Sequence, residues 1–580
     1  MCGICAIIGE SNKKLVLDMN NTMIHRGPDD SGIYVDDWFS LGHRRLSIID
    51  LSPNGRQPMT NEDDSVILIF NGEIYNFKEL RFELESKGHK FKSNTDTEVI
   101  IHLYEEEGKE CIKHLNGEFA FILIDKGKKD YLVARDRSGV KPLYVYRKDG
   151  IEYYASEIKA LLKIAPKEID YGSLNSYLKL RYYPGESTPF KNIFKIPIAS
   201  RTYLGPEKNR NFQKELDNDL NIAISRRLFA DVPVGIFLSG GVDSSLIAAI
   251  SSKESVQKTF SVGYEDESFE NELKQAKGIS DYIGSEHKEI FIGENSIDIL
   301  PKLLYHADEP IADPAAIPLW FLAKESKKSV SVVLSGDGAD ELFGGYEQYS
   351  IMLKLKKYTN FLTRMIAPSV RYIPNPLLNL KFKYTGELGP EGKKRFIDLV
   401  KNYGKSEAKD YQKIVGMFTE KELGEQNQGK LPFSYPESKS MLDNMQICDY
   451  HNFLQHLLLK VDKVTMAHSL EARVPYMDHK ILELSRRFDP SLRKDKIILR
   501  RVALDYLPKK VALRKKQRFF TPIHHWIKKY NIIDCVKNTK IVPRETIEKA
   551  VTHYDQSPLY YGRQIWTIYT FEKWNEAFNI

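Results

Sequence analysis

Short apolar runs separated by polar turn residues fill residues 1–160 of the chain. They include "RRLSIID", "SVILIFNGEIYN", "GEFAFILIDK" and "YLVARDR", and Gly, Asp, Asn and Pro interrupt them. Apolar runs of about four to eight residues between turn residues are typical of strands. Two segments differ: residues 77–88, where Leu80 and Leu84 stand four positions apart, and residues 97–108 both predict helices. Strands with a few helices favour an α+β domain built on layered sheets.

The pattern changes after "YLGPEKNRNF" at 203–212, a polar stretch with Gly and Pro that is the best candidate for a domain boundary. Beyond it, "VPVGIFLSGGVDSSLIAAIS" and "KSVSVVLSGDGADELFGGY" each predict a strand, a glycine turn and a helix, and "KTFSVGY" predicts another strand. Strands that alternate with helices indicate an α/β domain with a doubly wound parallel sheet. From residue 347 onward the signals are largely helical. We therefore expect two domains, 2–200 and 213–580.

Length and composition narrow the class of protein. A chain of 580 residues is too long for a single core. Its five cysteines are scattered and odd in number, which argues against a disulfide framework and for a reducing compartment. There is no signal-peptide pattern and no run of about 20 apolar residues, so we expect a cytoplasmic protein without a membrane partner.

The charge adds little to this picture. A net charge of +6 is a weak bias, and it does not by itself imply a nucleic-acid partner. The one dense basic run, "KKVALRKKQR" at 509–518, is either a solvated face or a loop that faces phosphate groups. We expect no nucleic acid as a partner.

The opening "MCGICAIIGE" places a cysteine directly after the initiator methionine. Cys2 is open to three interpretations at this point. It is a small residue without a role, or it forms a metal or redox pair with Cys5 in CxxC spacing, or it is a nucleophile. In the third case removal of Met1 gives Cys2 a free α-amine, with a pKa of about 8, that can serve as the general base for its own thiol.

The most specific chemical signal is "FLSGGVDSS" at 237–245. Paired glycines after a buried strand let backbone N–H groups approach phosphate oxygens, and the following helix offers its N-terminus. Asp243 adds a carboxylate suited to Mg²⁺. The stretch is neither a GxxxxGK[ST] loop nor a GxGxxG fingerprint, and it could also be a plain turn capped by Asp243 and Ser244. A second acidic glycine turn, "SGDGADE" at 335–341, favours a magnesium-nucleotide site because the two turns would meet at one sheet edge.

The motif "SGGVDSS" resembles the pyrophosphate loop of the N-type ATP pyrophosphatases. Together with "MCGIC", it makes the chain similar over essentially its whole length to the glutamine-dependent asparagine synthetases. The resemblance implies an N-terminal nucleophile amidotransferase domain with an αββα sandwich, followed by an ATP pyrophosphatase domain. It also implies glutamine, ATP and aspartate as substrates, Mg²⁺ as a cofactor, and a homodimer.

For the front domain, the resemblance makes Cys2 the nucleophile that attacks the carboxamide of glutamine. Arg45, in "HRRLSIID", would hold the α-carboxylate of glutamine, a task suited to a planar guanidinium. In "FNGEIYN", Asn71 and Gly72 would form the oxyanion hole and Glu73 would contact the α-amine. Asp96, in "SNTDTEVI", would be the second ligand of that amine. Cys5 is then a buried strand residue, since no further cysteine or histidine pair stands nearby to complete a zinc site.

For the second domain, the resemblance implies a set of ATP-binding residues. They are Leu238, Ser239, Gly240, Gly241, Asp243, Ser244, Ser245, Val262, Ser335, Gly336 and Lys463. Asp243 and Asp340 would be the Mg²⁺ ligands. Lys463, in "KVDKVTMAHSLEARVPYMD", would contact pyrophosphate and Asp337 would take part in catalysis. Arg473, in "EARVP", would help to shape the acceptor pocket.

The resemblance leaves the acceptor open. The segment "ADEPIADPAAIP" at 307–318 is also similar to amidotransferases of surface-polysaccharide clusters, which are thought to amidate sugar carboxylates. "KIPIAS" at 195–200 and Arg518 also depart from the usual family pattern. We expect aspartate as the acceptor, with a uronic acid as the alternative. A non-catalytic scaffold is disfavoured because Cys2, Arg45 and Asn71 are all intact.

Overall fold

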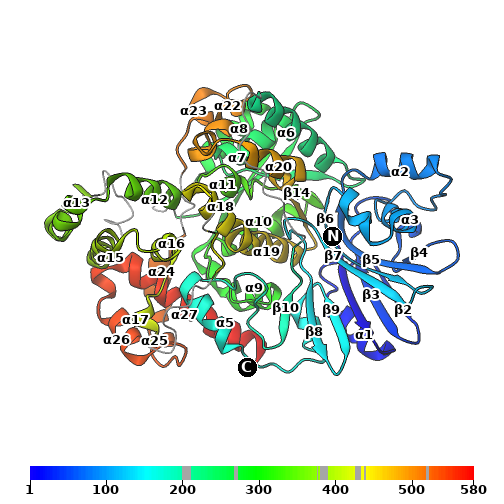
Figure 1. Ribbon diagram of the computed structural model, residues 1–580, viewed down its shortest axis with the longest axis horizontal. Coiled ribbons are helices and arrows are strands. Elements are labelled where there is room, and N and C mark those ends of the chain that lie inside the picture. The colour runs from blue at the N-terminus through cyan, green and yellow to red at the C-terminus, as the bar shows by residue number, and fades with distance from the viewer. Residues whose placement is uncertain are drawn as a thin grey trace.

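The computed structural model describes residues 1–198, 211–266, 272–374, 377–378, 389–424, 433–436, 439–516 and 521–580. Most of the predicted boundary stretch at 203–212, the end of "KIPIAS" and Arg518 lie outside the described residues. Figure 1 shows the N-terminal strands on one side of the molecule and the later helices on the other. Among the described residues, no helix has both the length and the apolar character needed to cross a membrane.

Two antiparallel sheets form the N-terminal part. The six-stranded sheet has the order β10-β8-β9-β1-β3-β2, and the four-stranded sheet has the order β4-β5-β6-β7. The strands of the first sheet are β1 (Gly3–Ile8), β2 (Asp30–Val35), β3 (Phe39–Arg45), β8 (Tyr144–Lys148), β9 (Ile151–Ala155) and β10 (Ile193–Lys195). Those of the second are β4 (Met59–Thr60), β5 (Val66–Ile74), β6 (Gly117–Asp125) and β7 (Asp130–Arg135).

The two sheets pack face to face, and helices cover their outer faces. Alternate residues of facing strands, such as Ile4 and Ile69, form the buried layer between the sheets. Helix α1 (Lys13–Asn21) covers the six-stranded sheet, and α2 (Phe77–Ser86) and α3 (Glu98–Glu107) cover the four-stranded one. This αββα arrangement confirms the predicted layered α+β fold, and α2 and α3 match the two predicted helices.

A five-stranded parallel sheet forms the core of the second part. Its strand order is β13-β12-β11-β14-β15, and every neighbouring pair is parallel. The strands are β11 (Val234–Phe237), β12 (Lys258–Tyr264), β13 (Glu286–Ile292), β14 (Val332–Leu334) and β15 (Glu471–Arg473). The doubly wound parallel sheet is thus confirmed. The short edge strand β15 is added from a point far along the chain, and the apolar pattern gave no sign of it.

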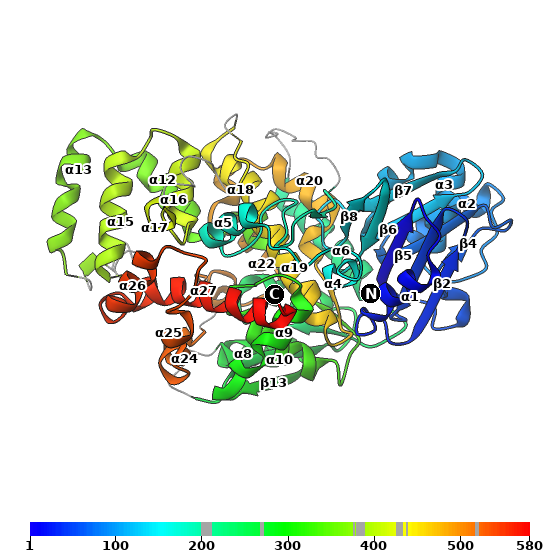
Figure 2. The same cartoon turned by 90° about the horizontal axis from the view of Figure 1, so that it is seen from below.

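Helices surround this sheet and extend away from it (Figure 2). Helix α6 (Phe212–Leu228) opens the second part, and α7 (Val242–Ser251), α10 (Ala316–Ser326) and α19 (Phe453–Met466) pack near the sheet. As predicted, the chain from residue 347 onward is mostly helical. It ends in α27 (Pro558–Phe578), a helix with many buried aromatic side chains.

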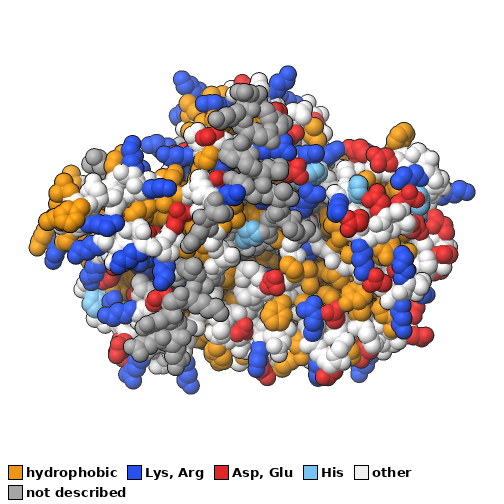
Figure 3. All heavy atoms as spheres, in the orientation of Figure 1, with side chains coloured by type: hydrophobic (Ala, Val, Ile, Leu, Met, Phe, Trp, Pro, Cys, Tyr) orange, Lys and Arg blue, Asp and Glu red, His pale blue; other side chains and the backbone are white. Residues whose placement is uncertain are grey.

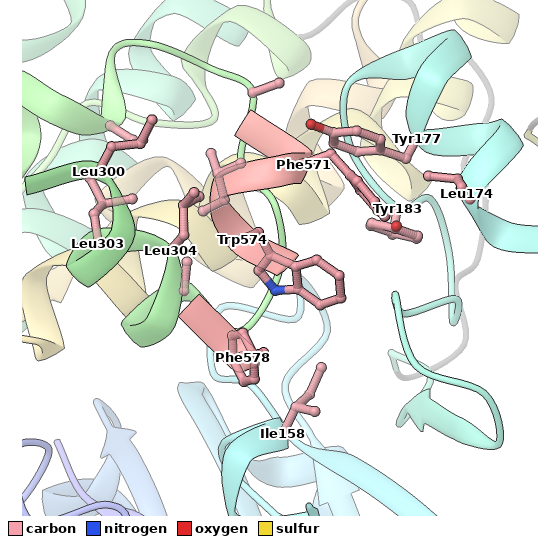
Figure 4. Packing of buried hydrophobic residues seen from close by; sticks show 14 of the residues in the cluster. Ile158, Leu174, Tyr177, Tyr183, Leu300, Leu303, Leu304, Phe571, Trp574 and Phe578 are labelled. Carbon is pink, nitrogen blue, oxygen red and sulfur yellow. The ribbon is translucent and has the colours of Figure 1, made fainter. Parts of the chain in front are cut away.

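Helix α27 also holds part of the N-terminal chain in place. Figure 4 shows Phe571 and Trp574 of α27 packed among Tyr177 of α5 (Tyr171–Leu180) and Leu304 of α9 (Leu300–Ala307). The hydroxyl of Tyr177 donates to the carbonyl of Thr567 at 2.8 Å. Residues before the predicted boundary at 200 therefore pack on the C-terminal helix.

Candidate functional site

The structure joins Cys2 to Asn71 across two sheets. Cys2 directly precedes β1 and is buried, and Asn71 lies in β5 with no exposed surface. The backbone N–H of Cys2 donates to Oδ1 of Asn71 at 2.8 Å, and the carbonyl of Cys2 accepts from Nε of Arg26 at 3.0 Å. Burial raises the pKa of the Cys2 thiol, although the N-terminal ammonium group opposes this shift. A thiol in this setting needs a nearby base before it can act as a nucleophile.

The amide of Asn71 has a free donor. Its Nδ2 is buried and has no hydrogen-bond partner among the described residues. The next residue, Gly72, lies so close to β6 that an added Cβ would stand 2.2 Å from the carbonyl oxygen of Glu118. Any other residue at position 72 would force the strands apart. An unpaired buried N–H beside a thiol has the character of an oxyanion hole.

The front domain also contains two buried carboxylates, Glu73 and Asp96. Asp96 accepts the backbone N–H of Ile74 at 2.7 Å, and burial raises its pKa to about 7. Burial also raises the pKa of Glu73, while the guanidinium of Arg473, 3.2 Å away, acts against that shift. A cation such as an α-ammonium group, placed beside buried carboxylates, favours their charged form and opposes the effect of burial.

Arg45 lies at the end of β3, where its guanidinium bonds to the loop that follows. It donates to the carbonyls of Ser52 at 2.9 Å and Asp50 at 2.5 Å. Arg45 also lines a cavity of about 490 Å³, but Cys2 and Asn71 do not. Because Arg45 does not share this cavity with Cys2 and Asn71, its binding of the α-carboxylate of glutamine stays a prediction.

A second cavity, of about 430 Å³, lies at the carboxyl ends of the parallel strands. The two glycine turns meet here because β11 and β14 are neighbours, with Ile236 opposite Leu334. The cavity brings together most of the residues predicted for ATP: Leu238, Ser239, Gly240, Gly241, Asp243, Ser244, Val262, Ser335 and Gly336. Asp337 and Asp340 line it as well.

The first turn is shaped for an anion. Gly240 has φ of +75°, and Gly241 precedes α7, whose N-terminus faces the cavity lining. The hydroxyl of Ser244 accepts the backbone N–H of Ser239 at 3.2 Å and fixes the turn. A glycine turn directly before a helix such as α7 presents N–H groups and the positive end of the helix dipole to a phosphate.

Asp243 and Asp340 share one cation in this cavity. The ammonium group of Lys496 lies 2.5 Å from Asp243 and 2.6 Å from Asp340, and Lys516 lies 2.5 Å from the other oxygen of Asp340. Burial alone would raise the pKa of Asp340, but these two lysines hold it at about 2. Oδ1 of Asp243 accepts no hydrogen bond from any described residue.

Sequence reasoning missed most of the cations of this cavity. Those that line it are Lys460, Lys496, Arg500, Arg514, Lys515 and Lys516. Three of them belong to the basic run 509–518, and Nη1 of Arg514 donates to the carbonyl of Gly240 at 2.9 Å. Three residues of the run thus lie beside the first glycine turn. The interpretation of the run as a phosphate-facing loop was the one sequence signal that pointed to them.

Lys463 does not reach the nucleotide cavity, contrary to the expectation from its motif. It is 1% exposed, and its ammonium group bonds to Asp308 at 2.5 Å and to the carbonyl of Ser156 at 3.0 Å. Lys460, one helical turn earlier on α19, lines the cavity instead and pairs with Asp313 at 2.7 Å. Ser245 also lies outside the lining, because its hydroxyl donates to the carbonyl of Gly241 at 2.6 Å.

Arg473, which the resemblance assigns to the acceptor pocket, lies between the second glycine turn and the front domain. It lies in β15 without exposed surface and does not line the nucleotide cavity. Its guanidinium pairs with Glu471 at 2.6 Å and with Glu73 of the front domain at 3.2 Å. The buried carboxylates attract this side chain toward the Cys2 region, away from the nucleotide.

The N-terminal ammonium group of Met1 also lies near Arg473, because both contact Glu471. It is 2.9 Å from Oε2 of Glu471, and both groups are fully buried. In the chain as described, Met1 still precedes Cys2, so the nitrogen of Cys2 is a peptide N–H.

Comparisons with known proteins match two families to successive parts of the chain. The asparagine synthase family matches residues 215–576, and the glutamine amidotransferase domain family matches residues 1–214. Asparagine synthetase [glutamine-hydrolyzing] 1 of Bacillus subtilis is 34% identical over 99% of this chain and 96% of its own length. A putative asparagine synthetase of Mycobacterium bovis is 31% identical over 100% of this chain and 97% of its own.

Among solved structures, a Bacillus subtilis glutamine phosphoribosylpyrophosphate amidotransferase matches 50% of this chain and 65% of its own. The identity is 17% and the TM-score is 0.27, which is too low to support an argument. The two family matches and the full-length relatives are sufficient by themselves: this chain belongs to the asparagine synthase family and carries an N-terminal glutamine amidotransferase domain.

Proposed function

We propose that the protein is a glutamine-hydrolysing asparagine synthetase, with the division 2–200 and 213–580 as its two domains. The observation that carries the proposal is the presence, in one chain, of the buried Cys2–Asn71 pair and the phosphate-shaped cavity at the parallel sheet. Relatives matched along the whole chain bear the name asparagine synthetase.

In the first half-reaction, we propose that Cys2 attacks the side-chain amide carbon of glutamine. Once Met1 is removed, the α-amine of Cys2 takes the thiol proton. The unpaired Nδ2 of Asn71 and the N–H of Gly72 then stabilise the oxyanion. The α-ammonium group of Cys2 returns the proton to the amide nitrogen, which leaves as ammonia, and water releases glutamate from the thioester. Glu73 and Asp96 hold the α-amine of glutamine, and Arg45 holds its α-carboxylate.

In the second half-reaction, an oxygen of the acceptor carboxylate attacks the α-phosphorus of ATP, and pyrophosphate leaves. Ammonia then attacks the acyl carbon and AMP leaves, which forms the amide. Lys496, Lys516 and Arg514 line the cavity at the glycine turns and would offset charge on the phosphates as pyrophosphate departs. Asp337 lies in the same lining, where it can contact the acceptor or the phosphates.

The chemistry of Asp243 and Asp340 fits Mg²⁺, since both are carboxylates in the cavity and Oδ1 of Asp243 is without a hydrogen-bond donor among the described residues. When bound there with ATP, Mg²⁺ would neutralise part of the phosphate charge. Lys496 now lies between the two carboxylates, so it has to move aside or share them with the ion.

The five cysteines are unpaired. Because reduced thiols are typical of a reducing compartment, we propose that the protein acts in the cytoplasm.

The test is pyrophosphate release from ATP and Mg²⁺ with saturating ammonium, with and without aspartate, while asparagine is assayed. Pyrophosphate matched by asparagine would support the proposal. Release that does not depend on aspartate, with glutaminase activity intact, would exclude aspartate and favour another carboxylate such as a uronic acid. Absence of both activities would exclude an amide ligase.

The Cys2→Ala variant separates the two halves. We expect it to abolish the use of glutamine and to leave ammonia-dependent synthesis at the level of the unchanged protein, since Cys2 does not line the nucleotide cavity. Glutamine-dependent synthesis that survives this change would show that Cys2 is not the nucleophile.

A further inference from the structure

Two histidines and one glutamate converge on the outer side of the front domain. His102 and Glu105 stand three residues apart on α3, which places them on one face of the helix, and His89 follows the end of α2. The potential ligand atoms of these three residues all lie within 4.8 Å of one another. Oε2 of Glu105 is 2.8 Å from Nδ1 of His102 and 3.5 Å from Nδ1 of His89. Figure 3 shows histidine and acidic side chains gathered over this part of the surface.

These separations suit a small tetrahedral ion. Ligand atoms about 2.0–2.1 Å from a zinc ion stand about 3.3 Å from one another. The observed contacts of Glu105 with the two rings bracket that value. No pair of these ligand atoms is more than 4.8 Å apart, so the donors would have to approach one another by at most about 1.5 Å to close on an ion.

The second nitrogen of each histidine faces a carboxylate, but only that of His89 lies at hydrogen-bond distance. Nε2 of His89 lies 3.0 Å from Glu106, whose other oxygen lies 3.0 Å from Lys87. Nε2 of His102 lies 3.7 Å from Glu98, which is too far for a hydrogen bond, and it has no hydrogen-bond partner among the described residues. Histidines that bind metals usually present their second nitrogen to a carboxylate in this way, because it fixes the ring and makes the first nitrogen more basic.

The carboxylate of Glu105 is oriented too. Its Oε1 accepts from Nδ2 of Asn61 at 2.8 Å, which leaves Oε2 to face the two histidines. Glu105 and His89 are thus oriented by neighbours that are not ligands themselves.

Ion pairs alone explain the cluster less well than a metal does. Both nitrogens of His89 lie within 3.5 Å of a carboxylate oxygen, and a neutral imidazole can donate only one proton. Protonation of both rings would satisfy every contact, but the ring centroids of His89 and His102 are only 4.8 Å apart, and His102 is 1% exposed. Two cations at that distance repel each other strongly when partly buried. A metal ion at the Nδ1 atoms lets each neutral ring donate its remaining proton outward.

We propose that His89, His102 and Glu105 bind one Zn²⁺ ion, with water as the fourth ligand. Two imidazoles and one carboxylate are typical zinc ligands, whereas Mg²⁺ and Ca²⁺ favour oxygen donors alone. The binding itself does not depend on the proposed activity.

The ion would hold the segment that carries Asp96. His89 lies before that segment and His102 after it, and Glu98 accepts the backbone N–H groups of Lys92 and Ser93, both at 2.8 Å. A zinc clip between α2 and α3 would tie the two ends of the segment together. It would act as a structural element, because the ion does not contact the reacting atoms.

The test is a calorimetric titration of Zn²⁺ into chelator-treated, full-length Cys2→Ala protein with saturating Mg²⁺, so that neither the thiol nor the aspartates of the cavity compete. We expect one Zn²⁺ per chain, with affinity at least about tenfold weaker in His89→Gln and in Glu105→Gln. The matched control is His114→Gln, because His114 forms an ordinary exposed pair with Glu107 at 2.7 Å outside the cluster. It should leave Zn²⁺ binding unchanged.

Two further readouts keep the proposal falsifiable. Co²⁺ in place of Zn²⁺ should give the intense visible absorption of a tetrahedral site, and Zn²⁺ should raise the unfolding temperature of the parent protein but not of the His89→Gln variant. His89 is on the surface side of the cluster, so its replacement keeps the fold. Equal Zn²⁺ affinity in the parent and in His89→Gln, or no binding to the parent at all, would overturn the proposal.

Discussion

At the scale of single residues, the clearest evidence is a donor without an acceptor. Nδ2 of Asn71 is buried beside Cys2 and pairs with no described residue, although a buried N–H left unpaired costs about 1–3 kcal/mol. The fold tolerates this because Oδ1 of the same amide is fixed by the N–H of Cys2. The orientation of the amide is therefore set before any substrate arrives.

Replacing Asn71 with Leu should lower kcat for glutamine hydrolysis by about 10²–10³, which is the usual loss for one oxyanion donor. Leu has the same branched arrangement of non-hydrogen atoms as Asn, so the sheets should remain packed. Glutaminase assays of the purified variant measure the effect, and ammonia-dependent synthesis serves as the internal control. A loss of less than threefold in kcat would remove Asn71 from the oxyanion hole.

Asp96 leads to a prediction about pH. Its pKa is about 7 in the folded protein and about 3.9 in an unfolded chain. A carboxyl whose pKa is raised by folding makes the protein less stable as it ionises, so this contribution falls as the pH rises from about 4 to about 7.

The Asp96→Asn variant cannot ionise, so it should unfold at a higher temperature than the unchanged protein at pH 8. The difference should shrink as the pH approaches 5. At the same time, its kcat/KM for glutamine should fall about tenfold or more, since the α-amine loses a charged partner. Thermal unfolding at both pH values checks the first part. A variant that is less stable than the parent at pH 8 would contradict the assignment.

At the scale of elements, the sequence predicted what lies close together along the chain. A strand, a glycine turn and a helix stand within about 20 residues of one another in each motif, so β11 with α7 and β14 with its turn were identifiable, as were α2 and α3. Parallel pairing of β11 with β14 followed from the alternation of strands and helices.

What the sequence did not reveal depends on contacts between distant segments. Lys496 and Lys516 follow Asp243 by more than 250 positions. They reach the cavity because α22 (Ile497–Ala503) packs on α6 and α7, and because the loop after α23 (Lys509–Ala512) lies beside the first glycine turn. The position of Lys463 outside the lining of the cavity could not be predicted for a related reason. Lys460, three residues earlier on the same helix, lines the cavity. Which of the two lysines faces the cavity depends on the orientation of α19, and the sequence does not show that orientation.

The basic segment after α23 should carry part of the affinity for ATP. Lys516→Ala removes one cation from the cavity lining, and we expect kcat/KM for ATP to fall about tenfold to a hundredfold, as for a hydrogen bond to a charged group. Lys509→Ala is the matched control from the same run, since Lys509 is exposed and does not line the cavity. Pyrophosphate release with ammonium measures both. Equal losses in the two variants would mean that net charge alone, and no contact of Lys516, is responsible.

At the scale of the whole molecule, buried charges join the two domains. Arg26 of the front domain lies 2.9 Å from Asp462, and Arg227 bridges Glu118 at 2.9 Å and Asp478 at 3.1 Å. Removal of one partner from a buried pair typically costs about 3–5 kcal/mol, because the other charge stays without compensation. The domains are thus held in one relative position by contacts that are expensive to break.

Arg473 is the residue of this interface that touches both sites. Its backbone carbonyl accepts the N–H of Ser335 in the second glycine turn at 2.9 Å, while its side chain lies 3.2 Å from Glu73 beside Cys2. An acceptor-pocket role, which its motif predicted, would make synthesis with ammonia the activity most sensitive to its loss. The observed contacts predict the reverse, because the side chain faces the glutamine carboxylates and only the backbone faces the nucleotide.

The Arg473→Met variant decides between these two roles, since Met keeps the length of the side chain and removes its charge. We expect kcat/KM for glutamine to fall about tenfold or more, as Glu73 loses its counter-charge and its pKa rises further. KM for ATP and for the acceptor in ammonia-dependent synthesis should change less than threefold, because β15 keeps its backbone bond to Ser335. Arg137→Met, which breaks the half-exposed interdomain pair with Glu483, is the control and should alter neither activity. If the variant instead loses acceptor affinity and keeps its glutaminase, the side chain must leave Glu73 when substrates bind, and the interface must rearrange during turnover.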